Sequence, residues 1–267
     1  MPSLKIEKSD LIKFKQNQQK IVCLTAYSFP IAKIIDSFCE IILVGDSLGM
    51  TIYGASSTIE VSLATMINHS KAVVKAVKHS FVVVDLPFGT YENSPQQALE
   101  TAKKVISETG CDAIKIETPR NLIATVDFLV KNNVPTIAHI GLMPQSIDKI
   151  GSYKYQGKDK QTADLLIEDS IMIANAGAIA IVIEAVPASL ASEITKTIKI
   201  PTIGIGASAD CDGQILVIDD LLGLNQEFKP RFVENYCDLA SIIENAVSKF
   251  SCDVKNGNFP QSKHLFQ

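Results

Sequence analysis

The stretch IILVGD, residues 41–46, is a short, uninterrupted apolar run that ends in an acid. Such runs are typical of parallel strands that are buried on both faces. The pattern recurs downstream in FVVVD (81–85), AIKIE (113–117) and AIVIE (180–184), and a further run, TIAHI (136–140), carries a histidine. A buried carboxylate is costly unless it is paired or holds a metal. Acids at successive strand ends therefore indicate a site for a hard cation, and hence an enzyme.

Strands and helices are expected to alternate along the chain. Apolar runs predict strands over 21–26, 41–46, 81–86, 113–117, 135–141, 179–185, 201–206 and 214–218. Helical patterns predict helices over 28–37, 62–78, 94–109, 121–132, 161–176, 187–198 and 234–250. Eight repeats favour a closed barrel over an open sheet, since LTAYSFP at the first strand end lacks a glycine-rich fingerprint. We predict a single α/β domain over 1–267, a (β/α)8 TIM barrel with a short N-terminal helix and a C-terminal tail.

Composition narrows the classes of partner. The chain has 267 residues, 46% of them hydrophobic, and a net charge of −4, which fits a globular protein and disfavours nucleic acid as a partner. No apolar run is long enough for a membrane span, and the charged first 20 residues lack the apolar segment of a secretion signal. Six cysteines without a CxxC pair suggest a reducing compartment. We expect a cytoplasmic protein that binds neither nucleic acid nor membrane.

Asp46 and Asp85 occupy matching places at the ends of two neighbouring expected strands. Glycines flank Asp46, so a ligand can approach the backbone there, and Ser47 adds a hydroxyl and an N–H. Alone, Asp46 could simply be a turn residue that caps a helix. Adjacent strands lie about 4.8 Å apart, however, and two carboxylates that close would repel without a cation between them. We predict that both bind Mg²⁺, which prefers oxygen ligands.

Lys115 and Glu117 lie two residues apart on one expected strand, so their side chains share a face. One could hold a substrate anion while the other binds the metal or its waters. Two alternatives remain open. The residues could form a self-contained ion pair at the strand edge, or Lys115 could be a Schiff-base lysine.

His139 and Glu184 belong to the next two expected strands. His139 could donate a hydrogen bond to a substrate, although a histidine within a strand is often only a core residue. Glu184 is the remaining acid at a strand end, on the opposite side of the barrel from the first three. That position suits a general base facing a metal-polarised carbonyl. The alternative is that Glu184 caps the helix that begins near Pro187.

A series of motifs in this order resembles the ketopantoate hydroxymethyltransferase family. The motifs are VGDSLGM, DLPFGTY followed by SPQQA, IKIE, AHIGLMPQS, YKYQGK, IEAVP, IPTIGIGA and DGQILVI, and the resemblance covers residues 4–262. It implies a barrel of the phosphoenolpyruvate/pyruvate type. It also implies transfer of a hydroxymethyl group from 5,10-methylenetetrahydrofolate to 3-methyl-2-oxobutanoate through a Mg²⁺-stabilised enolate. The products would be 2-dehydropantoate and tetrahydrofolate, in pantothenate and coenzyme A biosynthesis.

The resemblance also implies a role for each site residue. Asp46, Asp85 and Glu117 match the family's metal ligands, the last acting directly or through water. The keto-acid contacts match Asp46, Ser47, Asp85 and Lys115, the site histidine matches His139, and the catalytic base matches Glu184. Members of the family are homo-oligomers, typically decamers, so a homodecamer is expected here.

The chain departs from the family pattern at Thr118-Pro119, Lys158, Ser208 and Asp219, none of which is a predicted metal or base residue. These departures concern the loops expected to face the folate. Two other functions remain open: a carbon–carbon lyase of the isocitrate-lyase type, and a barrel that binds keto acids or folates without turnover. Against the lyase, the chain lacks the cysteine-containing loop motif that such enzymes use. Against a protein that only binds, all the predicted catalytic residues are present.

Overall fold

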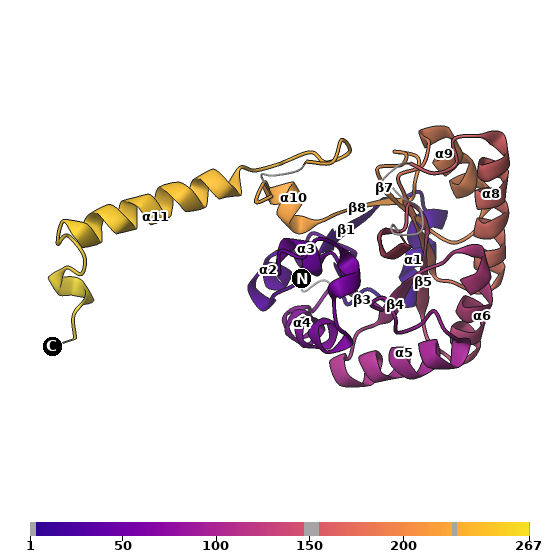
Figure 1. The fold of residues 1–267 in the computed structure, drawn as a ribbon, viewed down its shortest axis with the longest axis horizontal. Helices are drawn as coiled ribbons and strands as arrows, with labels where there is room; N and C mark the ends of the chain where they lie inside the picture. Colours follow the sequence, from indigo (N-terminus) through magenta and orange to yellow (C-terminus); the bar gives the residue numbers. More distant parts are fainter. Residues whose placement is uncertain (1–3, 147–154, 226–228, 267) are drawn as a thin grey trace. The chain divides into compact units, whose positions relative to one another are not determined.

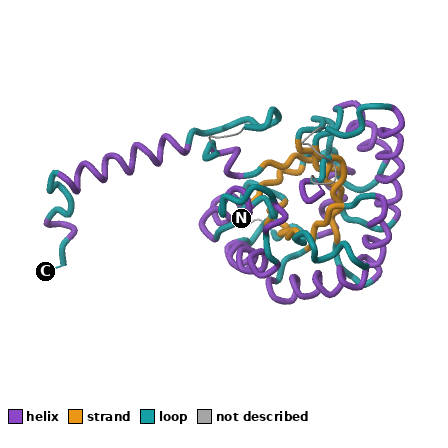
Figure 2. Tube along the Cα trace, in the orientation of Figure 1, coloured by secondary structure: helices purple, strands orange, loops and turns teal. Residues whose placement is uncertain are grey.

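Eight parallel strands form a closed barrel in the computed structural model, which describes residues 4–146, 155–225 and 229–266. The strands follow one another in chain order and β1 pairs with β8, which closes the ring (Figure 2). Their bounds are β1 Ile21–Thr25, β2 Ile41–Val44, β3 Phe81–Asp85, β4 Ala113–Glu117, β5 Thr136–Gly141, β6 Ala180–Glu184, β7 Thr202–Ile205 and β8 Gly213–Leu216. The predicted (β/α)8 barrel is confirmed.

Helices surround the strands in the barrel (Figure 1). The α-helices are α1 Lys8–Gln16, α2 Phe29–Ile35, α3 Leu48–Thr51, α4 Leu63–Ala76, α5 Pro95–Thr109, α6 Ile123–Lys131, α8 Lys160–Asn175, α9 Ala188–Thr197, α10 Ile218–Leu222 and α11 Leu239–Lys255. Short 3-10 turns are η1 Thr58–Glu60, η2 Arg120–Leu122, η3 Pro144–Ser146 and η4 Ser262–His264. Local chemistry sets the helix ends: at α5, Ser94 accepts a hydrogen bond from the N–H of Gln97, and Gly110 ends the helix at φ 74°.

The N-terminal segment closes one end of the barrel. Leu11 of α1 is fully buried in an apolar cluster with residues from the starts of the strands, including Ile21, Ile41 and Phe81. Lys15 of the same helix pairs with Asp212, just before β8, at 2.7 Å. The starts of the strands are therefore filled by apolar side chains, and the polar groups described below lie at the other ends.

The chain divides into two compact units, residues 1–217 and 218–267. The second contains α10 and α11, and within it none of the described residues of α11 is buried. Helix α11 begins five residues later than the predicted 234, because Asp238 accepts a hydrogen bond from the N–H of Ser241 and so starts the helix at Leu239. That all of residues 1–267 form one domain stays a prediction.

Candidate active site

The carboxyl ends of strands β2 to β6 bring the predicted site residues to one mouth of the barrel. Strand register sets the neighbours: Asp85 lies opposite Lys115, Glu117 opposite His139, and Gly141 opposite Glu184. The acids on β3 and β4, together with Lys115 and His139, are buried. Water is therefore largely excluded from these charged groups, which strengthens their mutual electrostatic interactions.

Asp46, Asp85 and Lys115 form a connected group. The N–H of Asp46 donates to Asp85 Oδ2 at 3.2 Å, and Lys115 Nζ lies 3.0 Å from Asp85 Oδ1. Lys115 thus forms an ion pair across the strands with Asp85. Asp46 follows β2 and does not cap α3, since no side-chain cap bond forms at that helix start.

The pKa values of this group follow from burial and mutual charge. Burial, together with the Asp46 carboxylate, raises the pKa of Asp85 to about 7, although the Lys115 ammonium opposes the shift. Burial on its own would lower the pKa of Lys115, but the carboxylates of Asp85 and Asp46 outweigh it and the net shift is upward. Lys115 is therefore held as an ammonium. A neutral amine, which a Schiff-base nucleophile requires, is disfavoured.

Glu117 faces the loop that follows β5. Its Oε1 accepts a hydrogen bond from the backbone N–H of Gln145 at 2.7 Å. Burial first, and the Asp46 carboxylate to a smaller extent, raise the pKa of Glu117 to about 8. The donated N–H opposes the shift but does not cancel it. Glu117 therefore tends to hold a proton at neutral pH, even though the Lys115 ammonium lowers its pKa.

His139 and Glu184 meet between β5 and β6. His139 Nε2 lies 3.1 Å from Glu184 Oε2, although the ring N–H is not aligned as a hydrogen bond. Burial first, and the Lys115 ammonium second, lower the pKa of His139, so the ring is neutral at neutral pH. Both ring nitrogens are buried and lack a hydrogen-bond partner among the described residues. A neutral imidazole in this state can donate to, or accept from, a bound molecule.

The backbone around Glu184 is constrained. Ala185 has a φ of 48°, a left-handed conformation that is uncommon for a residue other than glycine. Its N–H donates to Ile205 on β7 at 2.9 Å, and the N–H of Leu142 donates to the carbonyl of Glu184 at 2.9 Å. Helix α9 has Pro187 as its N-cap, with no side-chain cap bond, so Glu184 does not cap that helix. The strand end therefore fixes Glu184 beside His139.

Ser47 lies beside a residue that we did not predict. Its hydroxyl is 2.8 Å from the hydroxyl of Tyr27, which follows β1 and is buried. The carbonyl of Tyr27 in turn lies 2.6 Å from His69 Nδ1 on α4. Tyr27 thus adds a hydroxyl to the mouth next to Ser47.

Two further residues at the mouth, Gln145 and Tyr91, also escaped sequence analysis. Gln145 Nε2 donates to Asp46 Oδ2 at 2.7 Å, and the Tyr91 hydroxyl donates to Gln145 Oε1 at 2.5 Å. Tyr91 lies in a loop and Gln145 in the short turn η3, where no strand or helix period marks a side chain as buried. A signal did exist, because both lie inside motifs shared with the family, DLPFGTY and AHIGLMPQS.

The chemistry of the acids fits a hard divalent cation. The donors are all oxygen, as Mg²⁺ prefers, and Asp85 Oδ1 is buried with the Lys115 ammonium 3.0 Å away as its counter-ion. Over the same described part of the chain, no three side chains of the ligating types converge into a complete metal site. The roles of these residues stay predictions.

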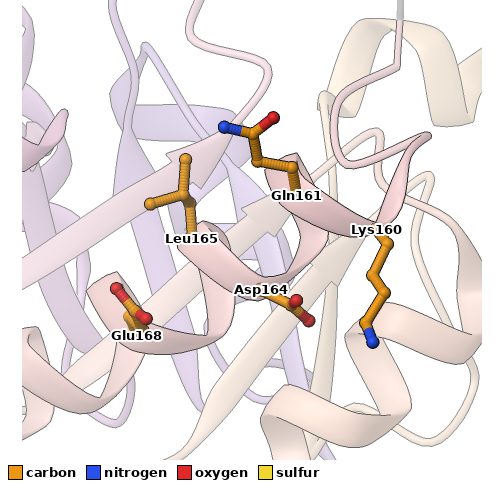
Figure 3. A pocket seen from close by; sticks show the side chains of 5 residues that line it. All are labelled: Lys160, Gln161, Asp164, Leu165 and Glu168. Atoms are coloured by element: carbon orange, nitrogen blue, oxygen red, sulfur yellow. The ribbon is translucent and has the colours of Figure 1, made fainter.

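Other features of the surface lie apart from this mouth. A shallow pocket on α8 is lined by Lys160, Gln161, Asp164, Leu165 and Glu168, and it contains none of the predicted site residues (Figure 3). In the part of the chain that the structure describes, no helix combines the length and apolar character required to cross a membrane.

The chain matches the family model described as ketopantoate hydroxymethyltransferase over residues 5–262. A curated relative from Cereibacter sphaeroides, named 3-methyl-2-oxobutanoate hydroxymethyltransferase, is 45% identical over 252 residues, which cover 94% of this chain and 91% of the relative.

Solved structures show the same fold. A 2,3-dimethylmalate lyase of the PEP mutase/isocitrate lyase superfamily matches with a TM-score of 0.64 at 14% identity, covering 94% of this chain and 89% of the lyase. A phosphonopyruvate hydrolase in complex with oxalate and Mg²⁺ matches with a TM-score of 0.62 at 12% identity, covering 97% and 91%. At such identities these structures establish the barrel type and no more.

Proposed function

This chain belongs to the ketopantoate hydroxymethyltransferase family, and from that premise we propose the reaction it catalyses. The one-carbon unit of 5,10-methylenetetrahydrofolate is transferred to C3 of 3-methyl-2-oxobutanoate, and one water molecule is consumed to supply the hydroxyl group, giving 2-dehydropantoate and tetrahydrofolate. The names of the relatives support hydroxymethyl transfer within the pantothenate pathway. The identity of the one-carbon donor rests on the resemblance to the family.

The proposal rests on two sets of side chains that lie at the same mouth of the barrel and differ in chemistry. On one side, Asp46 and Asp85 meet the ammonium of Lys115, an arrangement that suits a cation and a small anion together. On the other side, Glu184 lies beside the neutral His139. A 2-oxo acid offers a carboxylate and a keto oxygen to the first side and a C3 proton to the second.

Mg²⁺ fits the first side as the implied cofactor. When bound, it would polarise the keto group and stabilise the negative charge that develops on its oxygen. Asp46 and Asp85 would hold it, with Glu117 acting directly or through a water. The phosphonopyruvate hydrolase complex with oxalate and Mg²⁺ supports this choice, because oxalate carries a carboxylate beside a carbonyl as a 2-oxo acid does.

The residues of the chain itself perform the remaining tasks. The Lys115 ammonium and Ser47 offset the charge of the substrate carboxylate. Glu184 removes the proton from C3, which makes that carbon nucleophilic towards the one-carbon unit. His139 is neutral and donates a hydrogen bond without competing for the proton. A 15% exposed Glu184 side chain leaves the base accessible from the mouth.

We also propose that the protein works as a homo-oligomer, a homodecamer by resemblance, in the cytoplasm. The 17-residue helix α11 supports assembly, because Ile242, Val247 and Phe250 are more than half exposed along it. A helix with such an exposed apolar face is typically covered by another surface.

Proton exchange at C3 in deuterated water tests the assignment of the base. Wild-type protein with Mg²⁺ and 3-methyl-2-oxobutanoate should exchange this proton without folate, and addition of 5,10-methylenetetrahydrofolate should yield 2-dehydropantoate. Glu184→Gln keeps the shape of the side chain but cannot accept a proton, so exchange should fall ~10²-fold or more. His139→Asn should slow exchange less.

Glu193→Gln on the outer face of α9 is the matched control, because Glu193 is exposed and lies outside the mouth. It should exchange at the wild-type rate. Unchanged exchange in Glu184→Gln would remove Glu184 as the base. A wild-type protein that binds the keto acid without any Mg²⁺-dependent exchange would be a binding protein instead.

A further inference from the structure

Gln145 links three strands at the mouth of the barrel. It lies in η3, after β5, and only 6% of its surface is exposed. Its side-chain Nε2 donates to Asp46 Oδ2 at 2.7 Å and to the carbonyl of Leu86 at 3.1 Å. Its backbone N–H donates to Glu117. One residue thus contacts two of the three predicted metal ligands, one through its side chain and one through its backbone.

The orientation of the Gln145 amide is dictated by its partners. Nε2 faces a carboxylate oxygen and a carbonyl oxygen, both of which only accept hydrogen bonds, so the amino group must point there. Oε1 faces the hydroxyl of Tyr91, which donates to it. A flipped amide would place its oxygen against the Asp46 carboxylate and the Leu86 carbonyl, and both hydrogen bonds from Nε2 would be lost.

Tyr91 fixes that orientation from a second loop. It lies between β3 and α5 and is 1% exposed, so its hydroxyl is sealed from water. Burial, and then the neighbouring Glu117 carboxylate, raise the pKa of Tyr91, which keeps the hydroxyl protonated and able to donate. Replacement of this hydroxyl would leave Oε1 of Gln145 buried without its partner, so that only the two hydrogen bonds from Nε2 would still orient the amide.

We propose that Tyr91 and Gln145 form a positioning clamp, which holds one oxygen of the Asp46 carboxylate and so fixes the orientation in which Asp46 meets a divalent cation. The inference rests on the proposed metal site at Asp46 and Asp85. A metal ligand is commonly oriented by such outer partners, and their removal typically weakens metal affinity about 10- to 100-fold. Neither residue touches the substrate in this assignment, because each acts through Asp46.

Binding of Mn²⁺ to the full-length protein, read from the electron paramagnetic resonance signal of free Mn²⁺, tests the clamp without catalysis. Gln145→Ala should raise the dissociation constant about 10- to 100-fold. Tyr91→Phe, which removes one oxygen and preserves the ring, should raise it in the same direction and by less. Gln96→Ala is the matched control, since Gln96 bonds Glu100 on the outer surface of α5, and it should bind like wild type.

A double-mutant cycle separates positioning from a general structural role. If Tyr91 acts through Gln145, Tyr91→Phe should have almost no further effect in the Gln145→Ala background. Turnover measurements should agree with this. In each variant the Mg²⁺ concentration for half-maximal activity should rise, while the rate at saturating Mg²⁺ should return close to the wild-type rate. A variant that had merely lost its fold would not recover in this way.

Three outcomes overturn the clamp. The first is unchanged Mn²⁺ affinity in both variants, and the second is full additivity of the two substitutions. The third is tighter binding in Gln145→Ala, which would mean that the amide competes with the cation for Asp46. Absence of Mn²⁺ binding by the wild-type protein would refute the proposed metal site itself, and the clamp with it.

Discussion

Replacement of Lys115 by methionine should make the stability of the barrel strongly dependent on pH. Lys115 Nζ lies 3.0 Å from Asp85 Oδ1, and the two side chains are only 10% and 5% exposed. Methionine preserves the length and the apolar stem but removes the charge. Asp85 would then be a buried acid without its cation, and an unpaired buried charge is strongly destabilising.

The sign of the pH dependence follows from the pKa of Asp85. With Lys115 present, that pKa is raised from 3.8 to about 7, so folding favours the protonated acid. Wild-type stability therefore falls as pH rises from about 4, and the fall ends near pH 7, where the folded-state acid ionises. Without Lys115 the folded pKa lies higher still, so the fall continues above pH 7.

The two proteins should differ little at pH 6, where Asp85 is mostly protonated in both. Above pH 7 the gap should widen by about 1.4 kcal/mol per pH unit, until the pKa of the variant is reached. At pH 9, two units above the wild-type pKa of about 7, the free energy of unfolding of the variant should be lower by up to about 2.7 kcal/mol. Losses of this size are usual when one partner of a buried ion pair is removed.

Urea unfolding followed by far-ultraviolet circular dichroism, at pH 6 and pH 9 in the presence of EDTA, measures this gap. Lys71→Met is the matched control, because Lys71 pairs with Glu108 at 2.9 Å but both side chains are exposed, at 48% and 38%. That substitution should change stability by less than about 1 kcal/mol at either pH. An equal loss at pH 6 and pH 9 in Lys115→Met would refute the reasoning, since the loss could not then come from ionisation of Asp85.

Three other predictions concern the metal, the lysine and the strand end. Asp46→Ala and Asp85→Ala should each abolish Mg²⁺-dependent turnover while circular dichroism shows the barrel intact; retained Mg²⁺-dependent activity in either would contradict its role as a ligand. Borohydride reduction of the wild-type protein with 3-methyl-2-oxobutanoate should leave its mass unchanged, because Lys115 is held as an ammonium, whereas a mass gain at Lys115 would indicate a Schiff base. Gly141→Ala should lower the free energy of unfolding by about 2–4 kcal/mol, because Gly141 has a φ of 91° and a methyl group there would overlap the carbonyl of Glu184; a melting temperature equal to wild type would contradict this.

The eight strands could be predicted to within one or two residues of their observed ends, because buried parallel strands appear as apolar runs of a length set by the barrel. The acids at the strand ends were recognisable for the same reason. Tyr91 and Gln145 were not, because a buried polar side chain in a loop is specified by partners distant in sequence, and Gln145 lies 99 residues from Asp46. The start of α11 was misplaced because the side chain of Asp238, and no change in hydrophobic pattern, begins that helix.

Helix α1, which closes the barrel at the starts of the strands, affects how the chain folds while the ribosome makes it. Lys15 on α1 is anchored by Asp212, 197 residues later in the chain, and strand β1 completes its pairing only with β8. At ribosomal rates of about 5–20 residues per second, the first helix and strand therefore wait on the order of 10–40 s for their partners to be made. During that interval Leu11 and Ile21, both buried in the finished protein, have only part of their native cover. The nascent chain thus exposes its earliest apolar segment longest, which makes that segment the natural point of engagement for a chaperone.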